Sequence, residues 1–195
     1  MNKSRDTHPI KRAIFIDRDG TLNEEVGYIR EHAQFRLYDF AAEAVRLVNN
    51  AGWPAIVLTN QSGIARGLLT EAFLTELHQR MKTELAQGGA LVEAIYYCPH
   101  HTDFGAPPYR QDCDCRKPKP GLLLRASADF DLNLSECVVI GDRFRDVETA
   151  QAVGARGVLV LTGYGQEELK TVSTVQPDHI AKNLLEAVQW VIHES

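Results

Sequence analysis

The stretch Ala13-Ile14-Phe15-Ile16-Asp17-Arg18-Asp19-Gly20-Thr21 decides the fold. Its first four residues are apolar and predict a buried strand that ends at a pair of aspartates. Two later apolar runs, 54–58 and 138–140, are also closely followed by polar residues, Thr59 and Asp142. Ligands of parallel α/β sheets bind beyond the carboxyl ends of the strands. The polar residues therefore indicate a functional site at that edge of a sheet.

Apolar runs and helical spacing alternate along the rest of the chain. Further strands are predicted over 92–97 and 157–161. Strands that alternate with helices predict an α/β fold, in which a parallel sheet carries helices on both faces. We expect one domain over 13–195, preceded by a flexible extension over 1–12. The predicted helices cover 41–50, 70–87, 121–129, 146–153 and 180–193.

The composition is that of an ordinary soluble protein and excludes several classes. The 195 residues carry a net charge of −5, and 44% of them are hydrophobic. No apolar run approaches the roughly 18 residues of a membrane span, and residues 1–12 lack an apolar signal core. The negative charge disfavours a nucleic-acid partner. We expect a cytoplasmic protein without a membrane partner, and nothing in the chain demands association beyond a monomer.

The loop that follows the first strand carries two aspartates at positions i and i+2. Asp17 and Asp19 can point into one site there, and Gly20 permits a tight turn and a close backbone approach. A carboxylate can act as a covalent nucleophile for a phosphoryl group, and it can bind Mg²⁺. The alternative is a simple surface turn. The strand before the loop and the motifs described next disfavour that alternative.

Three further motifs supply groups suited to phosphoryl chemistry. The Thr59 hydroxyl can hold a phosphoryl oxygen, and Lys117, which precedes a predicted helix, can offset phosphoryl charge. Asp142 can complete a Mg²⁺ site with the first loop. Asp146 has a simpler alternative as an acidic residue that the helix dipole favours. Each motif alone has an ordinary explanation, and the order of the set makes it specific.

Three of the four cysteines fall close together, in Cys98-Pro99-His100 and Cys113-Asp114-Cys115. Three thiolates and one imidazole form a complete structural zinc set that leaves no open position for water. Free thiols or a disulfide are the alternatives, and a cytosolic location disfavours the disulfide. His101 could replace His100, but the symmetry of C-x-H with C-x-C favours His100. The predicted ligands are Cys98, His100, Cys113 and Cys115; Cys137 is expected in the core.

The order of D-x-D-G-T, a strand-end threonine, Lys-Pro and G-D-x-x-x-D resembles the haloacid dehalogenase superfamily of phosphotransferases over residues 13–165. The resemblance implies a Rossmann-like sheet and Mg²⁺. It also implies that Asp17 is the nucleophile, that Asp19 is the general acid and base, and that Thr59 and Lys117 stabilise the phosphoryl group. The implied Mg²⁺ ligands are Asp17, the backbone carbonyl of Asp19 and Asp142, with Asp146 orienting Lys117 or a metal-bound water.

Most of the chain is similar to the D-glycero-D-manno-heptose 1,7-bisphosphate 7-phosphatases. The similarity is carried by D-R-D-G-T, Gly27-Tyr28, residues 59–67, the zinc set and Cys115-Arg116-Lys117-Pro118. It implies removal of the phosphate on carbon 7, on the way to nucleotide-activated heptose for lipopolysaccharide core or another glycan. Members of this family often have lysine at position 143. The implied substrate contacts are Glu25, Val26, Gly27, Tyr28, Asn60, Gln61, Ser62, Arg116 and Arg143.

Two alternatives remain open at this point. Histidinol-phosphate phosphatases share the fold and a related zinc loop, but a bisphosphate needs more positive charge around the pocket. The candidate cations for that charge are Arg66, Arg116, Lys119 and Arg143. The other alternative is a non-catalytic zinc-loop binding module, which the intact catalytic set disfavours. Too little sequence lies between 20 and 41 for a separate cap domain, so we expect loops to define the substrate.

Overall fold

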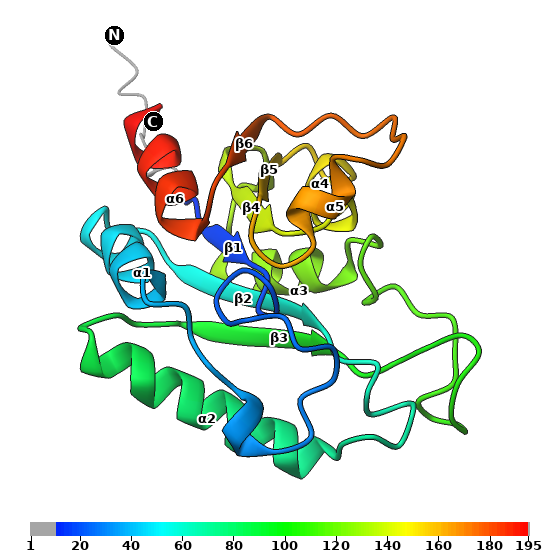
Figure 1. The fold of residues 1–195 in the computed structure, drawn as a ribbon. Coiled ribbons are helices and arrows are strands. Elements are labelled where there is room, and N and C mark those ends of the chain that lie inside the picture. The colour runs from blue at the N-terminus through cyan, green and yellow to red at the C-terminus, as the bar shows by residue number, and fades with distance from the viewer. Residues whose placement is uncertain (1–10, 195) are drawn as a thin grey trace, which may run out of the picture.

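The computed structural model describes residues 11–194, which contain one six-stranded parallel sheet (Figure 1). The strands lie in the order β3-β2-β1-β4-β5-β6, and each neighbouring pair runs parallel. This order places β1 and β4 side by side at the centre, so their carboxyl ends meet. The strands are β1 (Ile14–Ile16), β2 (Ala55–Asn60), β3 (Ala94–Cys98), β4 (Val138–Gly141), β5 (Arg156–Val160) and β6 (His179–Ala181).

Helices cover both faces of the sheet, as the α/β prediction requires. Side chains alternate along β1, so Ile14 and Ile16 enter one apolar cluster and Phe15 enters the other. The first cluster includes α1 (Ala41–Asn50), α2 (Glu71–Gln87) and α6 (Leu184–His193). The second includes α3 (Gly121–Phe130) and α4 (Phe144–Gln151). The Rossmann-like prediction is therefore confirmed. The remaining helical elements are η1 (His32–Gln34), η2 (Leu134–Glu136) and α5 (Gly165–Glu168).

The carboxyl-terminal segment differs from its prediction as a helix over 180–193. His179–Ala181 forms β6 and pairs with β5, and α6 begins only at Leu184. Asn183 starts the helix because its side-chain oxygen accepts a hydrogen bond from the Glu186 amide at 3.0 Å. The periodicity of the residues before Asn183 fits either a strand or a helix. Pairing with β5 makes His179–Ala181 a strand.

The amino-terminal extension was predicted over 1–12, and residues 1–10 of it lie outside the described residues. The two remaining residues contact the fold. The Lys11 carbonyl accepts a hydrogen bond from the Asn133 amide at 2.8 Å, and the Arg12 guanidinium lies 5.1 Å from the centroid of the Trp53 ring. The fold therefore begins ahead of β1.

The described residues contain no separate cap, which agrees with the sequence prediction. The segment between β1 and α1 is a loop that holds only η1, and the segment between β2 and α3 holds α2, β3 and the Cys/His loop. This loop extends away from the sheet edge between β3 and α3 (Figure 1). None of the helices described over residues 11–194 is long and apolar enough to cross a membrane.

Candidate active site

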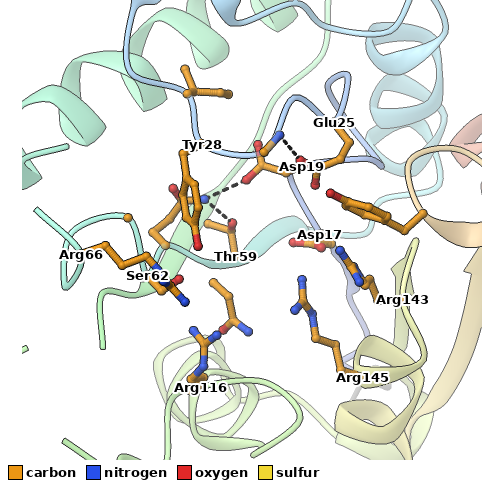
Figure 2. Close-up of a pocket in the computed structure, with 16 residues that line it drawn as sticks. Asp17, Asp19, Glu25, Tyr28, Thr59, Ser62, Arg66, Arg116, Arg143 and Arg145 are labelled. Carbon is orange, nitrogen blue, oxygen red and sulfur yellow. Dashed lines mark hydrogen bonds between the residues drawn. The ribbon is translucent and has the colours of Figure 1, made fainter. Parts of the chain in front are cut away.

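A polar pocket of about 210 Å³ lies beyond the carboxyl ends of β1, β2 and β4 (Figure 2). Most of the predicted catalytic and substrate-contact residues line it. Lys117, Asp142 and Asp146 lie buried and outside its lining. The lining residues are Asp17, Asp19, Glu25, Gly27, Tyr28, Ile29, Thr59, Asn60, Gln61, Ser62, Gly63, Arg66, Arg116, Arg143, Arg145 and Tyr164.

Lys117 connects two carboxylates at the base of the site. Its ammonium Nζ lies 2.9 Å from Asp17 Oδ1 and 2.6 Å from Asp146 Oδ1, and donates to the Leu58 carbonyl at 2.8 Å. Burial alone lowers the pKa of Lys117, but the charges of Asp146 and Asp17 outweigh burial, so its pKa is raised above the ordinary value. The lysine therefore carries a fixed positive charge next to Asp17, which suits it to offset a second anion there.

Asp142 lies against the first loop because Gly20 and Gly163, which have no side chains, leave room for its carboxylate. Its Oδ2 accepts a hydrogen bond from the Tyr164 amide at 2.8 Å. Gly20 has φ +81°, and a Cβ at Gly20 would collide with Asp142 Oδ2. Burial, reinforced by the charge of Asp17, raises the pKa of Asp142 to about 8. Burial also raises the pKa of Asp17 to about 6, although Lys117 opposes this shift.

The carboxylates of Asp17, Asp142 and Asp146 form a cluster that fits a divalent cation. One oxygen from each lies within 4.8 Å of the others, and all three residues are buried. Lys117 bridges two of these three acidic groups, and burial is the main reason why the pKa values of Asp17 and Asp142 are raised. Carboxylate oxygens are the ligands that Mg²⁺ prefers. The structure thus adds Asp146 to the predicted pair of carboxylates, and the Asp19 carbonyl belongs to the same loop as Asp17.

Asp19 is held on several sides by hydrogen bonds. Arg18 donates to its two oxygens at 2.7–3.1 Å, and Asn23 and Gln61 donate to it at 3.1 and 2.8 Å. The other side of the Arg18 guanidinium lies 3.2 Å from Nε2 of His78. Burial, together with the charge of Arg18, lowers the pKa of His78 to about 3, so this imidazole is neutral. Asp19 is therefore the ion-pair partner of the buried arginine.

The residues that end β2 connect the first loop to Lys117. Gln61 Nε2 donates to Thr59 Oγ1 and Asp19 Oδ2, both at 2.8 Å. The Asn60 side chain donates to the Lys117 carbonyl and accepts from the Lys117 amide, both at 3.1 Å. Asn60 was predicted as a substrate contact, and it lines the pocket, but both ends of its amide hold the Lys117 backbone. Positioning Lys117 is the structural task of Asn60.

Two arginines lie next to Asp17 at one end of the pocket. Figure 2 shows the side chains of Arg143 and Arg145 directed toward Asp17 from the start of α4. Arg143 donates to Glu168 at 3.4 Å, and its guanidinium lies 3.5 Å from the centroid of the Tyr164 ring. This end of the pocket therefore has the Asp17 carboxylate with cations beside it.

A second pair of arginines lies on the other side of the pocket, next to the Cys/His loop (Figure 2). Arg66 Nη2 lies 3.3 Å from His101 Nε2, and its guanidinium lies 3.5 Å from the Phe104 ring centroid. Arg116 donates to the His100 carbonyl at 3.3 Å. The pocket therefore has cations at two separate places, and the loop around His100 builds the second of them.

The Cys98, His100, Cys113 and Cys115 side chains come together in the structure. Four distances join neighbouring atoms among His100 Nδ1 and the three Sγ atoms, and they measure 3.8, 3.6, 3.2 and 3.4 Å. Tetrahedral zinc with bonds of about 2.3 Å requires separations of about 3.8 Å between its sulfur ligands. All four cysteines are free, and Cys137 is buried in the core. The donor set thus fits a closed zinc site, with His100 rather than His101 in it.

Besides the buried residues named above, Lys119 and Val26 also lie outside the pocket lining. Lys119 was one of the candidate cations for the pocket, but it forms an exposed ion pair with Asp112 and does not contribute to the lining. Val26 was expected to touch the substrate, but it is 44% exposed and is not among the lining residues. Both lie one or two positions from residues that do contribute, because a loop presents only some of its side chains to one side.

The sequence reasoning assigned no role to three residues of the site: Arg18, Arg145 and Tyr164. Arg18 and Arg145 stand inside the two aspartate motifs, D-R-D and D-R-F-R-D. Their position next to the predicted catalytic carboxylates could have identified them as site residues. Tyr164 reaches the pocket from the segment between β5 and α5. Nothing in its local sequence marks that contact, which depends on the packing of Arg143.

Comparison with known proteins gives consistent matches. Residues 114–187 match the family model described as HAD-hydrolase-like. A D-glycero-D-manno-heptose-1,7-bisphosphate 7-phosphatase of Thermosynechococcus vestitus is 40% identical over 188 residues, covering 92% of this chain and 94% of that protein. The D-glycero-beta-D-manno-heptose-1,7-bisphosphate 7-phosphatase of Escherichia coli is 43% identical over 153 residues, which cover 77% and 80%.

A solved structure agrees with these relatives. The D,D-heptose 1,7-bisphosphate phosphatase of B. bronchiseptica, crystallised with magnesium and phosphate, has a TM-score of 0.86 to this chain at 30% identity. The match covers 95% of this chain and 100% of that one. Sequence, fold and the pocket's phosphoryl-handling groups agree, and the chain therefore belongs to the D-glycero-D-manno-heptose 1,7-bisphosphate 7-phosphatase family, phosphatases of the haloacid dehalogenase superfamily.

Proposed function

We propose that this protein removes the phosphate on carbon 7 of D-glycero-D-manno-heptose 1,7-bisphosphate, with Mg²⁺ and through an aspartyl phosphate on Asp17. The observation that carries this proposal is the division of positive charge in the pocket. Arg143 and Arg145 lie beside Asp17, while Arg66 and Arg116 lie next to the Cys/His loop. A substrate with two separated phosphates matches two separated cationic groups, whereas a monophosphate leaves one of them without a partner.

The nucleophilic step uses Asp17 and the groups fixed around it. One carboxylate oxygen of Asp17 attacks phosphorus, and Lys117, 2.9 Å from that carboxylate, offsets the repulsion between two anions. The Thr59 hydroxyl, held by Gln61 at 2.8 Å, is available to a phosphoryl oxygen. Asp17, Asp142 and the Asp19 carbonyl, with Asp146 in support, would hold Mg²⁺, which would supply additional charge neutralisation there.

Asp19 handles the protons in both halves of the reaction. It protonates the sugar oxygen as the bond between that oxygen and phosphorus breaks, which leaves a phosphate on Asp17. It then takes a proton from the water that attacks the phosphorus and releases Asp17. The donors Arg18, Asn23 and Gln61 fix the orientation of the Asp19 carboxylate for both steps.

The remaining pocket residues determine which substrate enters. Arg116 and Arg66, with Ser62 nearby, receive the phosphate that is not cleaved, and Glu25, Gly27 and Tyr28 face the sugar between the two phosphates. Arg143 keeps the positive charge that a lysine often supplies in this family. A fork-shaped guanidinium stacked on Tyr164 offers a more directional contact than an ammonium.

We propose that zinc at Cys98, His100, Cys113 and Cys115 is structural and sets the position of Arg116. Arg116 follows the ligand Cys115 directly and donates to the carbonyl of the ligand His100. Four protein ligands leave no position for a catalytic water. The zinc loop thus replaces a cap as the wall that recognises the second phosphate.

The cellular role follows from this substrate. Removing the phosphate on carbon 7 leaves a sugar 1-phosphate, the form from which nucleotide-activated heptose is made for lipopolysaccharide or another glycan. We propose that the protein acts in the cytoplasm as one domain over residues 13–195 and as a monomer. One chain builds the whole pocket for a small bisphosphate, so the reaction needs no partner chain, nucleic acid or membrane.

Substrate preference tests the proposal most directly. We expect kcat/KM for the heptose bisphosphate to exceed that for histidinol phosphate. Arg116→Ala is expected to lower the bisphosphate value by about 10–100-fold, the cost of about 1.5–3 kcal/mol for a charge-assisted hydrogen bond. The same variant should change hydrolysis of p-nitrophenyl phosphate little, because that substrate has one phosphate. A preference for histidinol phosphate would instead assign the protein to amino-alcohol phosphate hydrolysis.

The covalent step has its own test. Asp17→Asn is expected to lower kcat by at least about a thousandfold while leaving the far-ultraviolet circular dichroism unchanged. Acid quenching of Asp19→Asn during turnover should trap phosphate on the peptide that contains Asp17, because the second half-reaction lacks its base. Unchanged turnover by Asp17→Asn, with no phosphorylated peptide, would exclude this mechanism.

A further inference from the structure

We propose that Arg145 is an additional catalytic residue, whose guanidinium binds the phosphoryl group during its transfer to and from Asp17. The inference rests on the proposed phosphoryl transfer but does not depend on the sugar. Arg145 lies in the first turn of α4, between Arg143 and Asp146, and lines the pocket. Figure 2 shows its guanidinium directed toward Asp17.

Among the described residues, the side chain of Arg145 is a sheltered donor with no acceptor. Its Nε is buried and has no hydrogen-bond partner. Within residues 11–194, no carboxylate comes within the 4.0 Å of an ion pair with this guanidinium. Burying a charged donor without a partner is costly. The position therefore makes physical sense if an anion takes the place of the missing acceptor.

The neighbours of Arg145 show why that anion is not one of the carboxylates. Lys117 is held directly by Asp17 and Asp146, and Arg143 is held by Glu168 and Tyr164. Despite burial, the charges of Asp146, Asp17 and Asp142 raise the pKa of Arg145. None of the three carboxylates lies within 4.0 Å of its guanidinium, the distance of an ion pair. The carboxylates keep the guanidinium charged and attract it to this side of the pocket without occupying its donors.

Phosphoryl transfer supplies an acceptor of suitable shape. Negative charge spreads over three oxygens of the transferring group, and a planar guanidinium can donate two parallel hydrogen bonds to such oxygens. In each half-reaction one bond to phosphorus forms and one breaks, first from Asp17 in place of the sugar oxygen and then from water in place of Asp17. The proton moves through Asp19, and Arg145 neither gives nor takes one.

The experiment compares Arg145→Ala with Arg156→Ala, a matched control whose arginine stacks on Trp190 and lies outside the pocket. With saturating Mg²⁺ and p-nitrophenyl phosphate, we expect kcat of Arg145→Ala to fall about 10²–10³-fold, as for loss of one donor to a developing charge. Added guanidinium chloride, at concentrations that leave the wild type folded, should restore part of the activity of Arg145→Ala. It should not raise the activity of Arg156→Ala.

Other outcomes decide against the inference. If Arg145 only offsets the carboxylates, Arg145→Ala will bind Mg²⁺ more tightly and keep the wild-type kcat at saturation. If Arg145→Ala does not fold, Arg145→Lys keeps the charge without the fork; a wild-type kcat in this variant would also overturn the inference. A large loss on p-nitrophenyl phosphate together with no hydrolysis of the heptose bisphosphate would uphold the role of Arg145 and refute the proposed substrate.

Discussion

Arg18 is among the largest fully buried side chains of the protein, and it stands between the two aspartates of the first loop. A buried arginine is tolerated only if its charge and its donors are matched. Asp19 provides the countercharge at 2.7 Å, and neutral His78 provides an uncharged partner at 3.2 Å. A protonated imidazole in that place would repel Arg18, so His78 contributes to the site by staying neutral.

The low pKa of His78 leads to a prediction about stability. Its pKa is about 3 in the folded protein and 6.5 when unfolded, so only the unfolded chain takes up a proton as the pH falls below 6.5. The folded protein therefore loses stability with acidification, by up to about 1.4 kcal/mol per pH unit. His78→Gln removes this loss. Urea unfolding should show the wild type losing about 2 kcal/mol more than His78→Gln between pH 6.5 and 5.

The comparison of the two proteins isolates this one group. The other titrating residues, including Asp17 and Asp142, are shared by the wild type and His78→Gln, so their effects cancel in the difference. Parallel stability curves for the two proteins over this pH range would mean that His78 is protonated in the folded state and that Arg18 has another partner.

At the level of single residues, the sequence was sufficient to predict the polar site residues that directly follow strands. Asp17, Thr59 and Asp142 could be predicted because a strand end fixes where the next side chain lies. Lys117 and Lys119 could not be distinguished in the same way. Contacts far away in sequence, with Asn60 and with Asp17, place Lys117 in the site, whereas Lys119 stays at the surface.

At the level of elements, the loop between β3 and α3 has little apolar content of its own, and its ends are held by the Cys/His cluster. Its contacts with the pocket pass through His100 and His101, which approach Arg116 and Arg66. Ordering this loop therefore orders one wall of the pocket. We expect structural and functional effects of the cluster to appear together.

Removal of zinc tests that connection. Structural zinc supplies on the order of 10 kcal/mol in small domains, and about 1 kcal/mol shifts Tm by about 2–4 °C at this size. Cys113→Ser, or chelation of the wild type, is therefore expected to lower Tm by at least about 10 °C. KM for the bisphosphate should rise more than KM for p-nitrophenyl phosphate, because Arg116 loses its position.

Cys137→Ala is the matched control, since Cys137 is buried and is not one of the four clustered Cys and His ligands. It should keep one zinc per chain by elemental analysis, whatever its effect on Tm. A Cys113→Ser protein with full zinc content, or with the Tm and both KM values of the wild type, would refute the structural zinc site.

The elements themselves were largely predictable, and the exceptions have a common cause. β1, β2 and β4 are buried on both faces and have an unbroken apolar pattern. β6 has three residues, one of them Ile180 at 41% exposure, so no periodicity separates it from the start of a helix. The short α5 has the same difficulty. Such short elements form because they pair or pack with a neighbouring element, and the local sequence does not show which element that is.

At the level of the whole molecule, the buried carboxylates make stability depend on both pH and metal. The pKa of Asp142 is about 8 in the folded protein and 3.8 when unfolded, so over this range the folded state holds a proton that the unfolded state has lost. Without metal, stability therefore falls as the pH rises, and the fall ends above the folded pKa. Metal binding to the ionised carboxylates offsets this loss.

The expected result is a metal-free protein that loses up to about 2 kcal/mol between pH 6.5 and 8, where the opposing titration of His78 contributes less than about 0.5 kcal/mol. Addition of Mg²⁺ should stabilise the protein more at pH 8 than at pH 6.5, as measured by chemical unfolding. Asp142→Asn should be nearly independent of pH in the same window. Equal stabilisation by Mg²⁺ at both pH values would argue against Asp142 as a metal ligand.

The Cys/His cluster also has an evolutionary consequence. It fixes both ends of a loop. The interior of this loop, residues 102–112, places Phe104 against Arg66 and adds no residue to the carboxylate cluster. Insertions and exchanges within this interior can change what the pocket accepts while Asp17, Lys117 and Asp142 keep their places. By contrast, deletion of one residue between Cys115 and Lys117 would disturb zinc binding, substrate recognition and chemistry at once. Natural diversification and directed evolution should therefore both concentrate their changes inside the loop.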